Sequence, residues 1–145
     1  MTNGEILQKI TELRTEVDEQ THLCSSIFKL DNVESKSIRE LTESILDKID
    51  TFKRYQAVIG KRNVNKTLVF KGNDYSAIDL IKIKEGILLK KQLNQMLINT
   101  NSEQDQMLQI SLEAFQSIQD YKKSLSEIHI ILQEFNNEQF DIKEY

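Results

Sequence analysis

The stretch Gly60–Lys91, GKRNVNKTLVFKGNDYSAIDLIKIKEGILLKK, decides how this chain is organised. It holds eight Lys or Arg against three acidic residues, a local net charge of +5 in a chain whose formal net charge is −4. The remainder of the chain therefore carries a net −9. Because like charges repel when they are crowded, a concentration of one sign predicts an anionic partner.

The apolar pattern also changes within this stretch. Thr67–Phe70 is a β-favouring run, and Lys71–Asp74 is a cluster of turn-forming residues. We therefore expect a short β-hairpin over about 63–75. Ser76 can cap the helix that follows, with Asp79 at a position that the helix dipole favours for an acidic residue.

Long helices are expected on both sides of the hairpin. The 145 residues include no proline and only four glycines, so the usual helix breakers are nearly absent. Apolar residues three and four apart predict helices over about 3–24, 37–59, 77–98 and 103–136. Gly60 is the expected stop of the second helix. The predicted fold is mainly α, a single domain built as a long-helix bundle or coiled coil with one inserted β-hairpin.

The fourth helix carries an apolar seam typical of helix–helix interfaces. Its members alternate in steps of three and four: Ile118, Tyr121, Leu125, Ile128, Leu132 and Phe135. At about 1.5 Å per residue this helix would be roughly 50 Å long, more than a compact monomer covers. We expect the seam to build a homo-oligomer, although a different protein partner is also compatible with it. The tail 136–145 is expected to fray.

Eleven residues in and near the basic stretch form a candidate site for an anionic ligand. They offer positive charge, amide groups or an aromatic ring to a nucleotide-like molecule: Arg54, Tyr55, Lys61, Arg62, Asn63, Asn65, Lys66, Asn73, Tyr75, Lys82 and Lys84. The N-terminus of the third helix adds a dipole that attracts anions. We expect alanine at Lys61 and Arg62 to abolish ligand binding and leave folding intact. The alternative is a solvated basic loop that pairs with acidic helices of a neighbouring subunit, since no glycine-rich phosphate motif is present.

Metal binding and catalysis find little support in the sequence. His22 and Cys24 lie two residues apart on a helix, about 200° around its axis, so they cannot grip one ion together. His129 falls inside the apolar seam of the fourth helix, where a surface or core role is the default. We expect no metal, no cofactor and no enzymatic activity.

The expected compartment is the cytoplasm, or the host cytoplasm if the protein is encoded by a phage. Cys24 is the only cysteine and cannot form an internal disulfide, and the N-terminus lacks the pattern of a secretory signal. No window is apolar enough to span a membrane, so no membrane partner is expected. The sequence pI of about 5.3 argues against binding bulk nucleic acid.

Several of the same residues carry a resemblance to a known family. Arg54 and Ala57, the 63–67 stretch, Gly72 and the entry Tyr75-Ser76-Ala77-Ile78-Asp79-Leu80 into a helix bearing Lys82 and Lys84 resemble the septicolysin-like family of small helical proteins. The lysines stand where arginines are more usual in that family. The resemblance implies a long-helix architecture with an inserted hairpin, assembled as an oligomer. It implies no activity, because the family has no established biochemical function.

The sequence therefore predicts a non-enzymatic protein that captures or sequesters a small anionic, nucleotide-like ligand in a basic site between subunits. A phage-type sponge for a host signalling molecule would fit this description. The alternative is a structural or adaptor coiled-coil protein that binds another protein.

Overall fold

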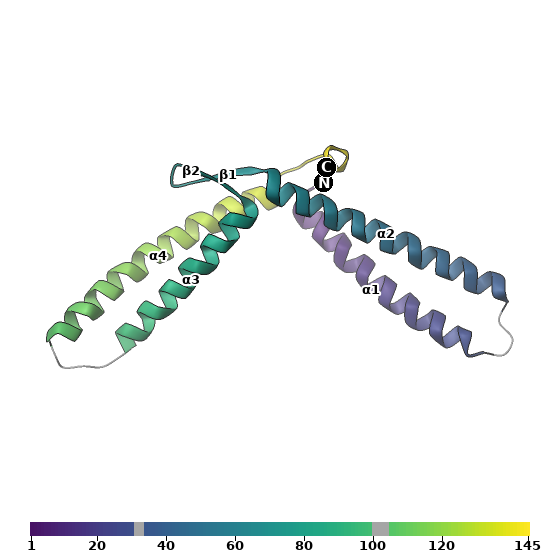
Figure 1. Ribbon diagram of the computed structural model, residues 1–145, viewed down its shortest axis with the longest axis horizontal. Helices are drawn as coiled ribbons and strands as arrows, with labels where there is room; N and C mark the ends of the chain where they lie inside the picture. Colours follow the sequence, from purple (N-terminus) through teal and green to yellow (C-terminus); the bar gives the residue numbers. More distant parts are fainter. Residues whose placement is uncertain (31–33, 100–104) are drawn as a thin grey trace. The chain divides into compact units, whose positions relative to one another are not determined.

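The computed structural model describes residues 1–30, 34–99 and 105–145. The described chain is mainly helical with one small antiparallel hairpin, as predicted (Figure 1). The elements follow in the order α1 (Asn3–Phe28), α2 (Ser35–Asn65), β1 (Thr67–Phe70), β2 (Asn73–Ser76), α3 (Ala77–Asn99), α4 (Asp105–Asn137) and a 3-10 turn, η1 (Ile142–Glu144).

The chain divides into two compact units where the sequence predicted one domain. Unit 1 comprises Met1–Arg62 together with Asn136–Tyr145, and unit 2 comprises Asn63–Phe135. Each unit is built on one helical hairpin, α1–α2 in unit 1 and α3–α4 in unit 2. Long helices joined by a short connection bury their apolar faces against each other, so each hairpin can form its own core.

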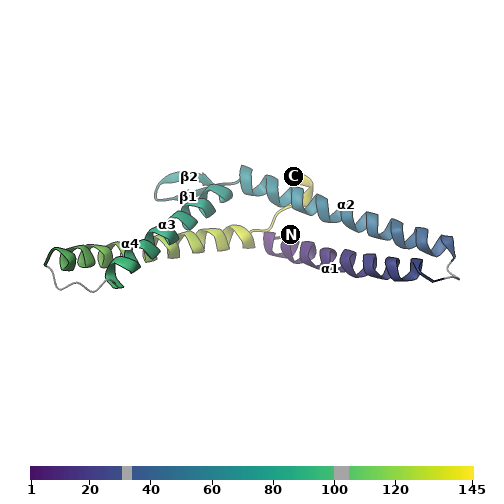
Figure 2. The same ribbon diagram turned by 60° about the horizontal axis from the view of Figure 1, so that its bottom comes forward.

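In unit 1, α1 and α2 run antiparallel and side by side (Figures 1 and 2). Ile6 of α1 is fully buried within the unit. A salt bridge of 2.7 Å joins Lys48 of α2 to Glu16 of α1. Helix α1 begins with a capping box, in which the Thr2 hydroxyl accepts from the Glu5 N–H and the Glu5 carboxylate accepts from the Thr2 N–H.

Helix α2 does not end at Gly60, and this prediction was wrong. The helix continues to Asn65, and Gly60 has no left-handed backbone angle. Val58 and Arg62, four residues apart, are buried on one face of the helix across the glycine. Packing of that face outweighs the roughly 1 kcal/mol that a mid-helix glycine costs.

Unit 2 places the hairpin against α3 and α4. Strands β1 and β2 pair antiparallel, with Phe70 opposite Asn73 across a two-residue turn. Lys71 and Gly72 in this turn both have positive φ, 49° and 77°, as the right-handed twist of a tight hairpin requires. The buried core of the unit consists of Leu68, Phe70, Ala77, Leu80, Ile128 and Phe135.

The apolar seam of α4 belongs to this core. Ile118 and Ile128 are buried, and Leu132 packs against the core that contains Leu80 of α3. The seam predicted as an interface between chains is therefore used within the chain. Aspartate at Ile128 would bury an unpaired charge in this core and disrupt the fold of unit 2.

Candidate functional site

The eleven candidate ligand-binding residues fall on both units. Four belong to unit 1, namely Arg54, Tyr55, Lys61 and Arg62, and the other seven belong to unit 2. Each group is therefore described within its own unit.

Only part of the unit 1 group is available to a ligand. Arg54 is exposed, and Tyr55 is half-buried. The Lys61 ammonium donates a hydrogen bond of 2.8 Å to the backbone oxygen of Tyr145. Arg62 is 1% exposed, so its guanidinium lies inside the unit.

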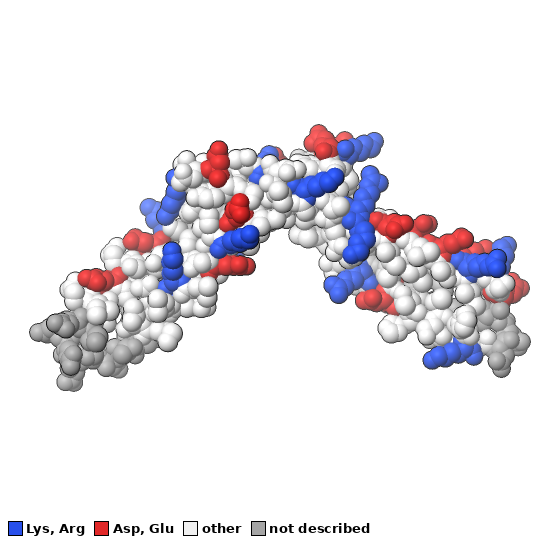
Figure 3. Space-filling view, viewed as in Figure 1, with Lys and Arg blue, Asp and Glu red and all other residues white. Residues whose placement is uncertain are grey.

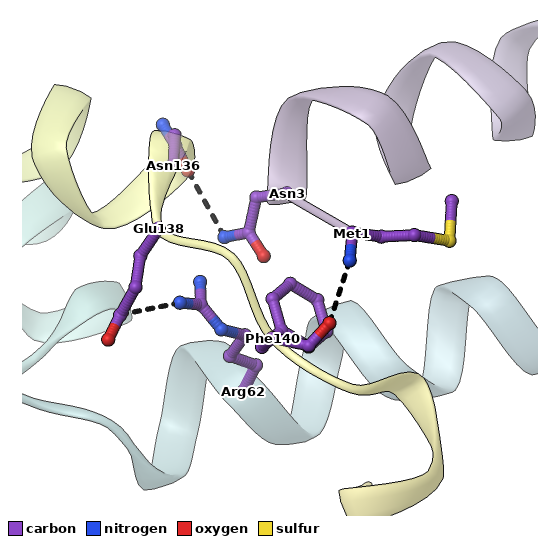
Figure 4. A network of polar contacts seen from close by, with 6 residues as sticks. All are labelled: Met1, Asn3, Arg62, Asn136, Glu138 and Phe140. Atoms are coloured by element: carbon purple, nitrogen blue, oxygen red, sulfur yellow. Dashed lines mark hydrogen bonds and ion pairs between the residues drawn. The ribbon is translucent and has the colours of Figure 1, made fainter.

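Arg62 is held by groups from the C-terminal segment (Figure 4). Its Nη2 lies 2.7 Å from Oε2 of Glu138, and its guanidinium carbon lies 4.3 Å from the centroid of the Phe140 ring. The ion pair and the cation–π contact compensate the cost of burying the charge. Arg62 was predicted to bind a ligand. Its guanidinium is instead buried and bonded to Glu138 within unit 1, so this side chain stabilises the fold.

The same network ties the C-terminal segment to the start of the chain. The Met1 amino group donates to the carbonyl oxygen of Phe140 at 2.7 Å, and the Phe140 N–H donates to the carbonyl oxygen of Met1 at 2.9 Å. Asn3, which is 2% exposed, donates from Nδ2 to Oδ1 of Asn136 at 3.1 Å. The tail expected to fray is thus bonded to unit 1 (Figure 4). We call Met1, Asn3, Arg62, Asn136, Glu138 and Phe140 the polar clasp.

The unit 2 group is more open. Asn65, Asn73 and Lys82 are exposed, and Asn63, Lys66, Tyr75 and Lys84 are half-buried. The Tyr75 ring packs against the core of the unit and lies 6.4 Å from the Phe70 ring, centroid to centroid. A stacking role for Tyr75 would compete with this contact.

The N-terminus of α3 already contains an anionic group. The Ser76 hydroxyl accepts from the Asp79 N–H at 3.1 Å and donates to the Asp79 carboxylate at 2.9 Å. This confirms the predicted cap. It also places a carboxylate in the first turn, where the dipole would otherwise attract a ligand anion. A phosphate bound here would meet a negative charge.

Acidic residues lie among the basic ones within unit 2. Helix α4 brings Asp120, Glu127 and Glu134 into the same compact unit as the lysines of the hairpin and α3. On the face seen in Figure 3, basic and acidic side chains are interspersed. The local excess of positive charge in the sequence is therefore diluted by residues that are distant along the chain. The sequence could not show this without the pairing of the helices.

The expectations about metals and membranes concern absences. Among the residues that the structure describes, no group of three or more His, Cys, Asp and Glu side chains could hold a metal ion. Within the same residues, no helix is long and apolar enough to cross a membrane.

A surface that the sequence analysis did not assign lies at the far end of the α3–α4 hairpin. Large apolar side chains are exposed on both helices, including Leu93 at 59% and Leu112 at 58%. We call this the distal apolar surface and define it as Leu89, Leu93 and Leu97 of α3 with Leu108, Leu112 and Phe115 of α4.

The signal for this surface was present in the sequence. The stripe on the third helix is wider than contact with one neighbour requires, which indicates a second contact. On α4, Leu108, Leu112 and Phe115 are spaced by four and three residues, but they precede the regular seam that begins at Ile118. They do not continue the heptad pattern of that seam.

Comparison with known proteins adds no relative. The chain matches no protein-family model, no curated protein and no solved structure. The resemblance to the septicolysin-like family therefore stays a prediction, and the function has to be argued from the residues themselves.

Proposed function

We propose that this protein is a non-enzymatic helical adaptor, and that the distal apolar surface of unit 2 binds a helical segment of a protein. The observation that carries the proposal is the exposure of large apolar side chains on both helices of one hairpin, typified by Leu93 and Leu112. Exposed apolar surface of this kind is typical of interaction sites.

The spacing of these side chains favours a helical partner. On α4, Leu108, Leu112 and Phe115 lie at i, i+4 and i+7, so they form one stripe along the helix. On α3, Leu89, Leu93 and Leu97 are four residues apart and follow a similar line. Ridges of this kind pack into the grooves of another helix.

Photo-crosslinking in cells that express the protein tests this proposal. A photoreactive phenylalanine analogue at position 115 should form protein adducts, and Leu112→Asp in the same chain should abolish them. The matched control places the analogue at Glu43, an exposed position of α2, where few adducts should form. Equal labelling at both positions, or adducts that persist in Leu112→Asp, would contradict the proposal.

Capture of a small anionic, nucleotide-like ligand is the second candidate function. The observation that favours it is Lys82, which is exposed and forms no ion pair within the described part of the chain. Asn73 is exposed in the same unit and could contribute an amide. Most of the other candidate residues have partners or are half-buried, so this candidate ranks below the adaptor.

A thermal-shift panel of mono-, di- and cyclic nucleotides tests the second candidate. A ligand that binds only the folded state raises the melting temperature, by an amount that grows with its concentration. Lys82→Ala should remove the shift, and Lys9→Ala, at an exposed position of α1 outside the candidate site, is the control. The ligand should be recovered chemically unchanged after denaturation of the complex. An absence of any shift across the panel would contradict ligand capture.

A further inference from the structure

We infer that the partner of the distal apolar surface is a second copy of the same chain, with α3 of one copy packed against α4 of the other. This inference rests on the proposed function and names the partner of that surface. The two hairpins would together form a four-helix bundle at this end of unit 2. Three observations on the described residues carry it.

The first observation is that α4 has two apolar faces. On α4, Ala114 and Ile118 are each 3% exposed and face the interior of the unit, whereas Leu112 and Phe115 are exposed. A helix in an isolated pair needs one apolar stripe, and a helix inside a bundle needs a wider one. The hairpin thus has the residue pattern of half a bundle.

The second observation is the distribution of charge. Over residues 86–98 and 108–119, the sequence has only Lys90 and Lys91 charged on α3, and only Glu113 charged on α4. Pairing α3 with α4 of a second copy brings opposite signs together. Pairing α3 with α3 would bring lysines together, which costs free energy. Charge complementarity therefore favours a second copy, and it favours the α3-to-α4 pairing over the α3-to-α3 pairing.

The third observation is the size and symmetry of the surface. The surface has six large apolar side chains on two neighbouring helices, and five of them are more than half exposed, as in the apolar centre of a homodimer interface. A two-fold axis would use the α3-to-α4 contact twice, because each copy supplies both helices. The α3-to-α4 contact, made twice, then covers the exposed apolar stripes of both helices.

Sedimentation equilibrium of the purified full chain is the first test. We expect a dimer, and we expect Leu112→Asp to shift the mass to that of a monomer while circular dichroism still reports the same helix content. The matched control is Leu46→Asp on α2, since Leu46 is 54% exposed and Leu112 is 58% exposed. Leu46→Asp should remain a dimer. A dimer that tolerates Leu112→Asp would overturn the inference.

Crosslinking tests the arrangement of the helices. In a Cys24→Ser background, one tagged chain carries Leu93→Cys and a co-expressed chain carries Leu112→Cys. A short bismaleimide should join the two different chains efficiently. Neither variant expressed alone should give a comparable yield of dimer. Efficient crosslinking of Leu93→Cys to itself would indicate contact between two α3 helices and overturn the α3-to-α4 arrangement.

The experiments distinguish failure of the second-copy inference from failure of the adaptor proposal. A wild-type chain that stays monomeric but forms adducts at position 115, sensitive to Leu112→Asp, overturns the second copy and leaves the adaptor proposal standing. A monomer without such adducts overturns both. A dimer sensitive to Leu112→Asp, in which position 115 crosslinks mainly to another copy, supports the inference.

Discussion

The two helical hairpins have similar lengths and different surfaces. In unit 1, α1 and α2 carry charged residues along their outer faces, and Lys48 bonds to Glu16 across the pair. In unit 2, residues 86–99 and 105–119 contain only four charged positions. Both hairpins expose apolar side chains, for example Phe28 at 74% in unit 1 and Leu93 at 59% in unit 2. In unit 2 the exposed apolar side chains lie in a stretch with few charged residues. The low density of charge around these side chains is the reason that we propose a binding surface on unit 2.

The interiors of the units differ as well. Unit 2 closes around an apolar core in which Leu80 and Ile128 are fully buried. At the base of unit 1, the polar clasp fixes the C-terminal segment through a buried guanidinium, Arg62. An apolar core tolerates small shifts of its members, whereas a buried charge needs its partner in one geometry. The two units should therefore respond differently to truncation.

The largest effect is expected from Ile128→Ala in the core of unit 2. Removing a fully buried isoleucine side chain costs transfer free energy and leaves a cavity, together about 2–5 kcal/mol. Hydrogen exchange should show faster opening of α3, α4 and the hairpin, with little change in α1.

The control for that prediction is Ile6→Ala, because Ile6 is fully buried in unit 1. It should accelerate exchange in α1 and α2 and spare the hairpin. If either substitution accelerates exchange equally in both units, the units unfold together and the comparison between them loses its basis.

Arg62→Ala should have the next largest effect, about 2–3 kcal/mol on the free energy of unfolding of unit 1. The substitution removes the ion pair with Glu138 and the contact with Phe140. Lys61→Ala is the matched control, since Lys61 is exposed and makes one bond to Tyr145. We expect Lys61→Ala to change stability little. Urea denaturation of both variants measures the difference, and equal midpoints would show that the clasp contributes nothing.

The sequence predicted the helices and the hairpin well because their signals are local. The cap at Ser76 and the turn at Gly72 depend on neighbours within a few residues, and both were found. The predicted end of α2 was wrong. Arg62 lies beyond Gly60 and bonds to Glu138, which is 76 positions away in the sequence. This long-range contact favours the continuation of the helix. No local pattern encodes that pair.

The candidate site was predicted less well for the same reason. Net charge along the sequence treats Arg62 as available to a ligand. In the structure its guanidinium is paired with Glu138, which lies in the last ten residues. Helix α4 places acidic groups in the same unit as the basic stretch. Its seam was identified correctly as apolar. Whether a seam faces its own chain or another depends on tertiary packing, which periodicity alone does not report.

A smaller effect is expected at the turn of the unit 2 hairpin. Lys71 has a φ of 49°, and its ammonium donates to the Ser124 hydroxyl at 2.8 Å. Lys71→Ile should destabilise unit 2 by about 1–2 kcal/mol, because a β-branched residue resists the left-handed region and the bond is lost. Lys71→Gly relieves the backbone and should cost less. Thermal melts of both variants test this, and an equal loss would mean that the side-chain bond alone matters.

The smallest effect concerns the start of α1 and depends on pH. The Thr2 N–H donates to the Glu5 carboxylate at 2.7 Å, and this bond lowers the pKa of Glu5 below its ordinary value. A carboxyl group with a lowered folded-state pKa stabilises the fold above its unfolded pKa, and this contribution is lost as the pH falls through the folded-state pKa. Glu5→Gln should therefore be less stable than the wild type at pH 7, and the gap should narrow in acid. Glu19→Gln, at an exposed position of the same helix, should show no such gap, and melting curves at pH 7 and pH 3 measure both. A gap that is the same at both pH values would mean that the contribution of the Glu5 bond does not depend on the charge. The absence of a gap at pH 7 would mean that unit 1 gains nothing from its capping box beyond the Thr2 hydroxyl.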